Sequence, residues 1–447
     1  MTYLKSLSIR KSILNLIKNN SLSYFFLFLT SIIIFRSVDR EAYGLYAALI
    51  SLQAFSELFM AGVNSTILRF MKEDIPLEDK YRILSSSILF KLFISGILTL
   101  VFWIFFEFNV FAEIISDIKL GHENLEYYLI LIILNNFLGS FSSIAASFLN
   151  SQNLFILTAK FDLQRNIIFF VIVLVLSFIT HEYLVYLYSS LVLSLIFFIV
   201  FLFLIRIELP DFWSIKSLNS FKNLDIIKKY HIRYSGPLTL SSIMTYSKNH
   251  LPIIFIGKFF NLDDVAVYSV IKSFFKSFHS VTGSFFEPML SKFVELKRNR
   301  ESFNKNFTKL FYWTFFIRLC LALSLVTFAE FYFQIYKIEF SELNFYVFLF
   351  LSIEFVLASN VQCFNTILKL DSNTTKIFIV SAIRFVSELI LIIVFLPLYG
   401  YLAASLILVL GRFIEFLFSH FFVGFKIVHL SYILIFIYPV FIITIMP

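Results

Sequence analysis

Long apolar stretches alternate with short polar segments along the whole chain. Twelve of these stretches have roughly the 20 residues that a helix needs to cross the hydrocarbon core of a bilayer. The pattern therefore predicts twelve transmembrane helices, six in each half of the chain. We expect them at Leu14–Phe35, Tyr43–Leu68, Ile83–Phe106, Tyr127–Leu149, Leu163–Ile179, Leu184–Ile205, Tyr234–Ile256, Val265–Leu290, Phe311–Phe333, Phe345–Leu368, Ile377–Leu396 and Tyr399–Phe422. A further apolar segment, Ser431–Ile445, is a candidate thirteenth span.

The distribution of basic residues predicts the orientation of these helices. Lysine and arginine accumulate in the cytoplasmic loops of membrane proteins. With the N-terminus inside, the outer loops hold only Arg36, Arg40, Lys119, Lys258 and Lys337, and the cytoplasmic segments hold most of the others. We therefore expect a cytoplasmic N-terminus. Its basic lead-in is not followed by a small-residue cleavage site, which predicts a retained first span.

The two halves of the chain carry similar segments at corresponding places. DREAYGLYAALISLQAF in the first half and LDDVAVYSVIKSFF in the second both lead from an outer loop into the second span. The third spans share a charge spacing: Arg82 lies nine residues before Lys91, and Lys309 lies nine residues before Arg318. The pattern predicts an internal repeat of six spans.

An even number of spans gives both repeats the same orientation in the membrane, with a cavity between the two lobes. The expected fold is an all-α polytopic membrane protein with twelve core helices in two parallel six-helix bundles. We expect the N-terminal bundle at residues 1–215 and the C-terminal bundle at residues 216–425. An additional hydrophobic segment covers residues 426–447.

Composition agrees with this picture and excludes several classes of protein. Apolar residues make up 59% of the chain and charged residues only 15%, against about a quarter charged in soluble domains. A soluble enzyme, a disordered chain and a protein with a single membrane anchor are thereby excluded. The net charge of +8 is explained by the basic cytoplasmic loops of a membrane protein. No nucleic-acid partner is therefore expected. The two cysteines lie in apolar stretches and have no metal-binding spacing, so no metal site is expected. No P-loop is present, which argues against an ATP-driven pump, and no cofactor is expected.

Ionisable side chains occur within the predicted spans, where each costs about 3 kcal/mol at a helix centre. They are expected to face one another or a hydrated cavity. Arg384 and Glu388 are spaced i,i+4, and Arg412 and Glu415 are spaced i,i+3. Each pair is predicted to neutralise itself on one helix face and is interpreted as structural.

Five cations and three carboxylates remain when these pairs are set aside. The cations are the candidate substrate-binding residues of an electropositive cavity: Lys91, Lys248, Lys272, Lys276 and Arg318. Lys91 and Arg318 lie at similar depth in corresponding helices, which suits an anion that enters from the cytoplasm. Lysine binds phosphate as a point charge and arginine binds it bidentately. The alternative is that these side chains extend to the lipid headgroups.

Polar residues also recur along one face of the eighth span, at Lys272, Lys276, His279, Gly283 and Glu287. Their spacing confines them to a narrow arc of the helix. Carboxylates near buried cations can exchange protons or hold Na⁺. The candidates for ion coupling are Glu57, His279, Glu287 and Glu354, with a structural role as the alternative for each.

Three segments resemble the polysaccharide (O-antigen type) flippase family of the multidrug/oligosaccharidyl-lipid/polysaccharide exporter superfamily. They are DREAYGLYAALISL running to NSTILRF, IGKFFNLDDVAVYSV in the second half, and LPLYGYLAASLILVL between the last two core spans. The resemblance covers the first twelve spans. It implies a V-shaped transporter of the bacterial inner membrane that flips undecaprenyl-pyrophosphate-linked oligosaccharide by alternating access, driven by an ion gradient. Its implied partners are this lipid-linked substrate, membrane lipids, and the polymerase and chain-length proteins of a polysaccharide export pathway.

Two other functions are weighed against this one. A drug or cation exporter of the same superfamily would favour an acidic cavity, whereas the predicted cavity is net positive. A polysaccharide polymerase or membrane glycosyltransferase often needs a sizeable outer catalytic loop, and no predicted outer loop is long. The expected function is therefore a flippase, not an enzyme.

Overall fold

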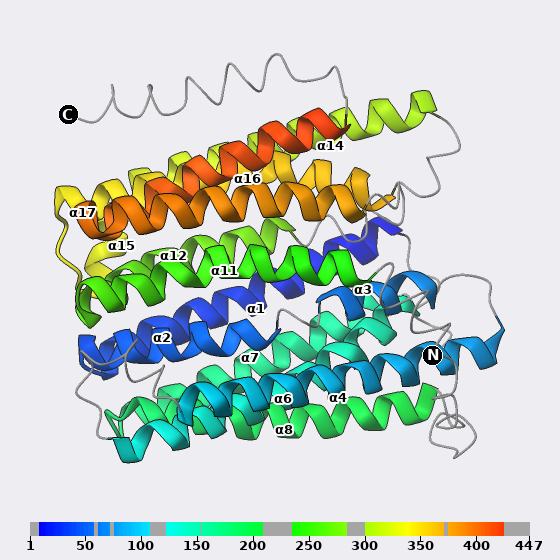
Figure 1. The fold of residues 1–447 in the computed structure, drawn as a ribbon, viewed down its shortest axis with the longest axis horizontal. Coiled ribbons are helices and arrows are strands. Elements are labelled where there is room, and N and C mark those ends of the chain that lie inside the picture. Colours follow the sequence, from blue (N-terminus) through cyan, green and yellow to red (C-terminus); the bar gives the residue numbers. More distant parts are fainter. Residues whose placement is uncertain are drawn as a thin grey trace. The chain divides into compact units, whose positions relative to one another are not determined.

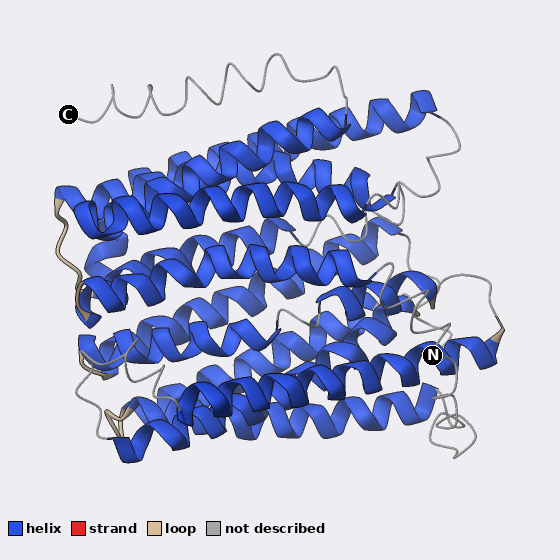
Figure 2. Ribbon diagram, viewed as in Figure 1, coloured by secondary structure: helices blue, strands red, loops and turns tan. Residues whose placement is uncertain are grey.

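The computed structural model describes residues 9–57, 61–71, 76–107, 122–152, 154–208, 235–283, 300–370 and 374–423. Within these ranges the chain is helical and contains no strand, as Figure 2 shows. The helices in the first part of the chain are α1 (Ile9–Ser37), α2 (Arg40–Glu57), α3 (Ala61–Phe70), α4 (Leu77–Glu107), α6 (His122–Ser151), α7 (Phe155–Ser177) and α8 (Tyr183–Glu208). They are followed by α11 (Gly236–Phe259), α12 (Leu262–Gly283), α14 (Arg300–Thr327), α15 (Ala329–Tyr336), α16 (Glu342–Leu370) and α17 (Thr374–Val423).

The helix positions agree with an all-helical, multi-pass architecture. Five of the described helices are long and apolar enough to cross a membrane: Lys18–Ser37, Tyr183–Ile207, Asn306–Thr327, Glu342–Leu368 and Thr374–Val423. The candidate thirteenth span lies outside the described residues.

The chain divides into two compact units, an N-terminal unit (Met1–Ala266) and a C-terminal unit (Val267–Pro447). In the N-terminal unit, α1 packs along α7 and α6 packs along α8 (Figure 1). α11, which the sequence places at the start of the second bundle, packs on α2 and α3. The division into bundles at residues 215 and 216 stays a prediction.

The core of the N-terminal unit follows from the apolar faces of α3, α4, α6 and α8. Val63 and Ile67 on α3 are fully buried against Phe148 of α6 and Phe201 of α8. Between helices in a bilayer such packing stabilises through van der Waals contacts, because the lipid tails are as apolar as the side chains. This packing fixes the positions of the polar residues on the same helices.

In the C-terminal unit, α16 packs against α14 and along α17. α17 consists of two arms, residues 374–399 and 401–423, which meet at a kink at Gly400. Gly400 has φ 63° and ψ −154°, a backbone conformation that glycine adopts readily because it has no Cβ. The two arms correspond to the eleventh and twelfth predicted spans.

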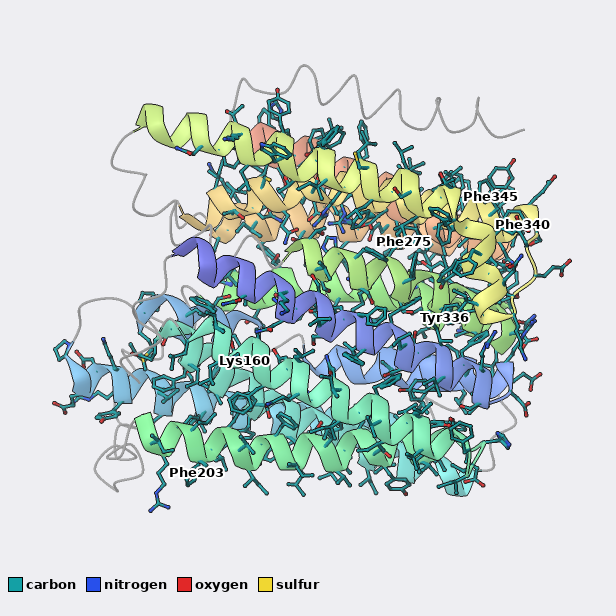
Figure 3. All side chains as sticks on the ribbon, turned by 180° about the vertical axis from the view of Figure 1, so that it is seen from behind. Lys160, Phe203, Phe275, Tyr336, Phe340 and Phe345 are labelled. Atoms are coloured by element: carbon teal, nitrogen blue, oxygen red, sulfur yellow. The ribbon has the colours of Figure 1, made fainter. Side chains whose placement is uncertain are left out.

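An aromatic core holds the other helices of the C-terminal unit together. The ring centroid of Phe274 on α12 lies 4.4 Å from that of Tyr332 on α15. The ring of Phe275, which Figure 3 labels, lies 4.8 Å from Phe348 of α16. Centroid separations in this range are typical of attractive aromatic pairs.

The ninth predicted span, Phe311–Phe333, is not one continuous helix in the structure. α14 ends at Thr327 and α15 begins at Ala329, because Phe328 has φ −99° and ψ 16°, outside the α-helical region. The break lets Tyr332 turn toward the aromatic core, where it packs on Phe348. The hydropathy of this segment is continuous, so the sequence pattern alone does not reveal the break.

Gly62 marks a close approach between α3 and the start of α11. A Cβ at this position would overlap the backbone oxygen of Ser235 and the side chain of Thr239. We expect Gly62→Ala to destabilise the protein by about 1–3 kcal/mol, as overpacking of a core does. The check is the midpoint of thermal unfolding in detergent. Gly96→Ala is the matched control because a Cβ there meets nothing within 4 Å, and equal midpoints for the two variants would contradict the prediction.

Candidate functional site

Five charged side chains form a buried ion-pair cluster in the C-terminal unit. Its members are Glu354 of α16, Arg384 and Glu388 of the first arm of α17, and Arg412 and Glu415 of the second arm. The packing of α16 along α17 brings the five together. Arg384 is 0% exposed and Glu388 is 1% exposed, whereas the side chains of Arg412 and Glu354 remain 13% and 17% exposed. The cluster is therefore buried at Arg384 and Glu388 and partly exposed at the other two.

Arg384 is the central residue of the buried ion-pair cluster. Its Nε donates to Glu388 Oε1 at 2.6 Å, and its Nη1 donates to Glu415 Oε2. Its Nη2 lies 3.9 Å from Glu354 Oε1. Arg412 completes the arrangement, because its Nε donates to Glu354 Oε1 at 2.7 Å and its Nη1 to Glu415 Oε2 at 2.9 Å.

The cluster holds two arginines and three glutamates, which gives a formal charge of −1. Lys272 of α12 interacts electrostatically with Glu354 and Glu388, and its Nζ lies 5.3 Å from the ring centroid of Tyr268. With Lys272 included, the charges balance. Gly411 on the second arm leaves room for the Glu388 carboxylate, which a Cβ at that position would overlap.

The structure corrects one expectation about these residues. The pairs Arg384–Glu388 and Arg412–Glu415 are both formed, at 2.6 Å and 2.9 Å, but neither is self-contained. Glu354, which is not a member of either predicted pair, accepts a hydrogen bond from Arg412 Nε. The spacing on one helix indicates the pairs, whereas the contribution of α16 depends on tertiary packing.

Arg318 of α14 forms a different kind of site in the same unit. It is 0% exposed, and its guanidinium binds neutral acceptors. Nη1 lies 3.2 Å from His279 Nδ1 and donates to Phe355 O at 3.2 Å, and Nη2 donates to Gln362 Oε1 at 2.8 Å. Its Nε is buried and has no hydrogen-bond partner among the described residues.

No carboxylate lies within salt-bridge distance of Arg318 in the described part of the chain. This distinguishes it from Arg384 and Arg412. Glu354 interacts with Arg318 electrostatically, but from beyond salt-bridge distance. A buried charge without a direct ion pair is costly, and arginine remains charged in proteins. Arg318 is therefore a cation that an external anion could neutralise.

Lys91 of α4 is a buried cation of the N-terminal unit. It is 0% exposed, and its Nζ donates to Ser143 Oγ of α6 at 3.1 Å. The amide of Asn64 on α3 donates to the same hydroxyl at 3.2 Å. Both Lys91 and Arg318 thus lie inside their own helix packing and bind a polar side chain of the next long helix.

The other predicted site residues differ in their surroundings. Lys276 is exposed and His279 is partly buried. Glu287 and the side chains of Glu57 and Lys248 lie outside the described residues. The candidate residues that the structure brings together are therefore Arg318 with His279, and Glu354 with the ion-pair cluster.

Two polar residues of α7 were not selected as candidates from the sequence. Arg165 Nη2 donates to Ser194 Oγ of α8 at 3.1 Å, and Asn166 Nδ2 donates to Ser23 Oγ of α1 at 2.6 Å. The predicted span started at Leu163, which placed Arg165 at the membrane edge. α7 instead starts at Phe155, so these residues lie well inside the helix.

Comparison with known proteins places the chain in a family. Residues 33–336, more than half of the chain, match the family described as "Polysaccharide biosynthesis protein". The chain belongs to this family. The match supports the resemblance that the sequence segments indicate. No curated protein matches the chain in sequence.

Solved structures of transporters share the fold. A lipid II flippase MurJ in an inward closed conformation has a TM-score of 0.69 at 15% identity, covering 95% of this chain and 91% of its own. An inward-facing multidrug resistance MATE family transporter of the MOP superfamily has a TM-score of 0.64 at 14% identity, covering 90% and 94%. A MOP superfamily transporter from Pyrococcus furiosus, whose title describes a binding pocket of reverse polarity, has a TM-score of 0.59 at 13% identity, covering 94% and 96%. This polysaccharide biosynthesis family member thus has the fold of a multi-pass membrane transporter.

Proposed function

We propose that the chain is a flippase that moves undecaprenyl-pyrophosphate-linked oligosaccharide across the bacterial cytoplasmic membrane. The substrate is a repeat unit of O-antigen, capsule or exopolysaccharide. Transport proceeds by alternating access of two six-helix bundles, residues 1–215 and 216–425, and is driven by an ion gradient. The N-terminus lies in the cytoplasm, and no enzymatic reaction is involved.

The burial of Arg318 without a direct ion pair is the observation that supports this proposal most strongly. A fully buried guanidinium that binds only neutral acceptors among the described residues suits a substrate that supplies the negative charge. A pyrophosphate does so and offers the paired oxygens that arginine binds bidentately. The apolar tail of such a substrate can stay in the lipid while the charged head crosses.

Lys91 supplies a second buried cation, in the other half of the chain. We propose that Lys91, Lys248, Lys272, Lys276 and Arg318 bind the pyrophosphate during transport. Glu57, His279, Glu287 and Glu354 are the candidates for ion coupling. Membrane lipids and the polymerase and chain-length proteins of an export pathway are the proposed partners.

The proposal is tested in liposomes that contain the purified full-length protein and a fluorescent polyprenyl-pyrophosphate disaccharide, with a proton or sodium gradient imposed across the membrane. A membrane-impermeant reductant quenches only the probe in the outer leaflet. We expect the protein to make the inner-leaflet probe available to the reductant, well above the leak of protein-free liposomes. A neutral polyprenyl disaccharide is the control and should not be moved. Movement of neither probe would contradict the proposal.

A drug or cation exporter is the competing function within the same fold. The net charge of the buried ion-pair cluster, −1 before Lys272 is included, is the observation that favours it. Efflux of a cationic dye from cells with and without the protein separates the two functions. Dye efflux without flipping of the pyrophosphate lipid would favour the exporter.

A further inference from the structure

Gln362 of α16 is an uncharged side chain that binds Arg318 directly. Its Oε1 accepts from Arg318 Nη2 at 2.8 Å. A guanidinium has only donors, so the oxygen of the amide, and not its nitrogen, must face Arg318. A glutamate has nearly the same shape as a glutamine and would place a carboxylate at the same point. The chain therefore has an amide where a carboxylate would form a direct ion pair with the buried guanidinium.

The amide of Gln362 and the guanidinium of Arg318 are both confined by their neighbours. The amide nitrogen lies 3.1 Å from the position of a Cβ at residue 283, so Gly283 of α12 gives the amide its space and allows it little more. Arg318 Nη1 donates to Phe355 O at 3.2 Å, and its Cζ lies 5.1 Å from the centroid of the Phe355 ring. The guanidinium is thus oriented by groups on α16 that do not neutralise it.

The charged groups near Arg318 do not replace a direct counterion. Glu354 attracts the guanidinium, Arg412 repels it, and the thiol of Cys363 also interacts with it. The carboxylate of Glu354 is already engaged, because its Oε1 accepts from Arg412 Nε at 2.7 Å and lies 3.9 Å from Arg384 Nη2. It is therefore shared between two arginines of α17, and the guanidinium of Arg318 keeps its charge for a ligand.

Gln362 also lies on the side of α16 that is not fully buried. Between Leu351 and Phe364, only Glu354 and Gln362 are partly exposed. They are about two helical turns apart, so they lie toward one side of the helix. An anion that reaches this side meets the amide and the guanidinium together. Arg318 Nε, which has no hydrogen-bond partner among the described residues, is a donor that such an anion can use.

We propose that Gln362 determines the preference of this site for a negatively charged head group. It orients the guanidinium of Arg318 without supplying a charge, so the pyrophosphate supplies the counterion. A carboxylate at this position would compete with the pyrophosphate, because hydrogen bonds between two charged groups are stronger than those to a neutral amide. Gln362 is a positioning residue that acts through Arg318. The inference rests on the proposed function, because it requires Arg318 to be the anion site.

The test compares two substitutions that separate charge from hydrogen bonding. Gln362→Glu keeps the shape and adds a carboxylate beside Arg318. Gln362→Met is unbranched and flexible, adds no charge and removes the acceptor. Gln164→Glu is the matched control, because it adds the same carboxylate at an exposed position of α7. The full-length proteins in detergent are titrated calorimetrically with farnesyl pyrophosphate, and with farnesol, which has the same chain without the charge.

We expect Gln362→Glu to raise the Kd for farnesyl pyrophosphate by about 10- to 100-fold, since the ligand must displace a charged hydrogen bond. Gln362→Met should stay within about fivefold of the wild-type Kd, because Arg318 still has no direct ion pair. Gln164→Glu should bind as the wild type does. The thermal unfolding midpoint of Gln362→Glu should be equal to or above that of the wild type, because the new carboxylate pairs with Arg318, whereas Gln362→Met should unfold earlier.

A purely structural role for Gln362 would give the opposite order of binding, because methionine removes the hydrogen bond that glutamate keeps. A larger loss of affinity in Gln362→Met than in Gln362→Glu, or a wild-type Kd for Gln362→Glu, would overturn this inference and leave the proposed function standing. The same holds if the affinity for farnesol falls in parallel, or if Gln362→Glu unfolds below the wild-type midpoint. Absence of farnesyl pyrophosphate binding to the wild type would overturn the anion site itself, and with it both proposals.

Discussion

Replacing Arg384 by leucine is expected to lower the free energy of unfolding by about 3–5 kcal/mol, the usual cost of removing one partner from a buried ion pair. Arg384 is 0% exposed and donates to Glu388 and Glu415, while Glu354 lies 3.9 Å away. Its removal leaves three glutamates with one arginine. Leucine has a suitable volume but supplies no charge, so the carboxylates lose their main counterion.

The measurement is the midpoint of thermal unfolding of purified variants in one detergent. Arg82→Leu is the matched control, because Arg82 pairs with Glu78 at 2.7 Å with side-chain exposures of 34% and 76%. Such a surface pair contributes about 0–1 kcal/mol. The double variant Arg384→Leu/Glu388→Leu restores the cluster's charge of −1 and is expected to recover part of the lost stability. A single variant as stable as the Arg82 control would show that the cluster is not structural.

The helices were the most predictable part of this molecule. α8 begins at Tyr183 and ends at Glu208, against a predicted span of Leu184–Ile205, because hydropathy marks a segment that must cross an apolar medium. α11, at Gly236–Phe259, agrees similarly with Tyr234–Ile256. The ends differ by a few residues because helices continue into the polar region beyond the apolar stretch.

Contacts between charged side chains were predictable only when both residues lie on one helix. The i,i+4 spacing indicates Arg384–Glu388, but nothing in the sequence places Glu354, thirty residues earlier, against Arg384 and Arg412. The Arg318–His279 contact likewise joins α14 to α12. Each residue was a candidate by itself, since an ionisable group inside a span is costly, but the pairing depends on how the helices pack.

Polar residues near a span end were harder to interpret than those at a span centre. Arg165 lies two residues inside the predicted start at Leu163, where a basic side chain can reach the cytoplasmic headgroups. In the structure α7 starts at Phe155, and Arg165 binds Ser194 on a neighbouring helix. A charged or amide group shortly after a predicted start is therefore compatible with either a loop or a buried contact.

Replacing Arg318 by glutamine is expected to reduce flipping of the pyrophosphate lipid by about 10- to 100-fold. Hydrogen bonds to a charged group contribute about 1.5–3 kcal/mol, and 1.4 kcal/mol corresponds to a factor of ten. Arg318→Lys keeps the charge but loses the bidentate geometry, so a smaller loss is expected. The measurement is the initial rate of probe movement in the liposome assay, with Arg206→Gln as the control, because Arg206 is exposed at the end of α8.

The stability of Arg318→Gln distinguishes the role of Arg318 from that of the ion-pair cluster. Arg318 donates only to neutral acceptors in the described residues, and its Nε has no hydrogen-bond partner there. Glu354 interacts with it electrostatically from beyond salt-bridge distance, so removal of Arg318 breaks no ion pair in the described residues. We expect the thermal unfolding midpoint of Arg318→Gln to be equal to or above that of the wild type, while its transport rate falls. Arg384→Leu, in contrast, is expected to lose stability. Loss of folded protein in parallel with transport would assign Arg318 a structural role. Full transport in a triple alanine variant at Lys91, Lys276 and Arg318 would remove the case for a pyrophosphate site built from these cations.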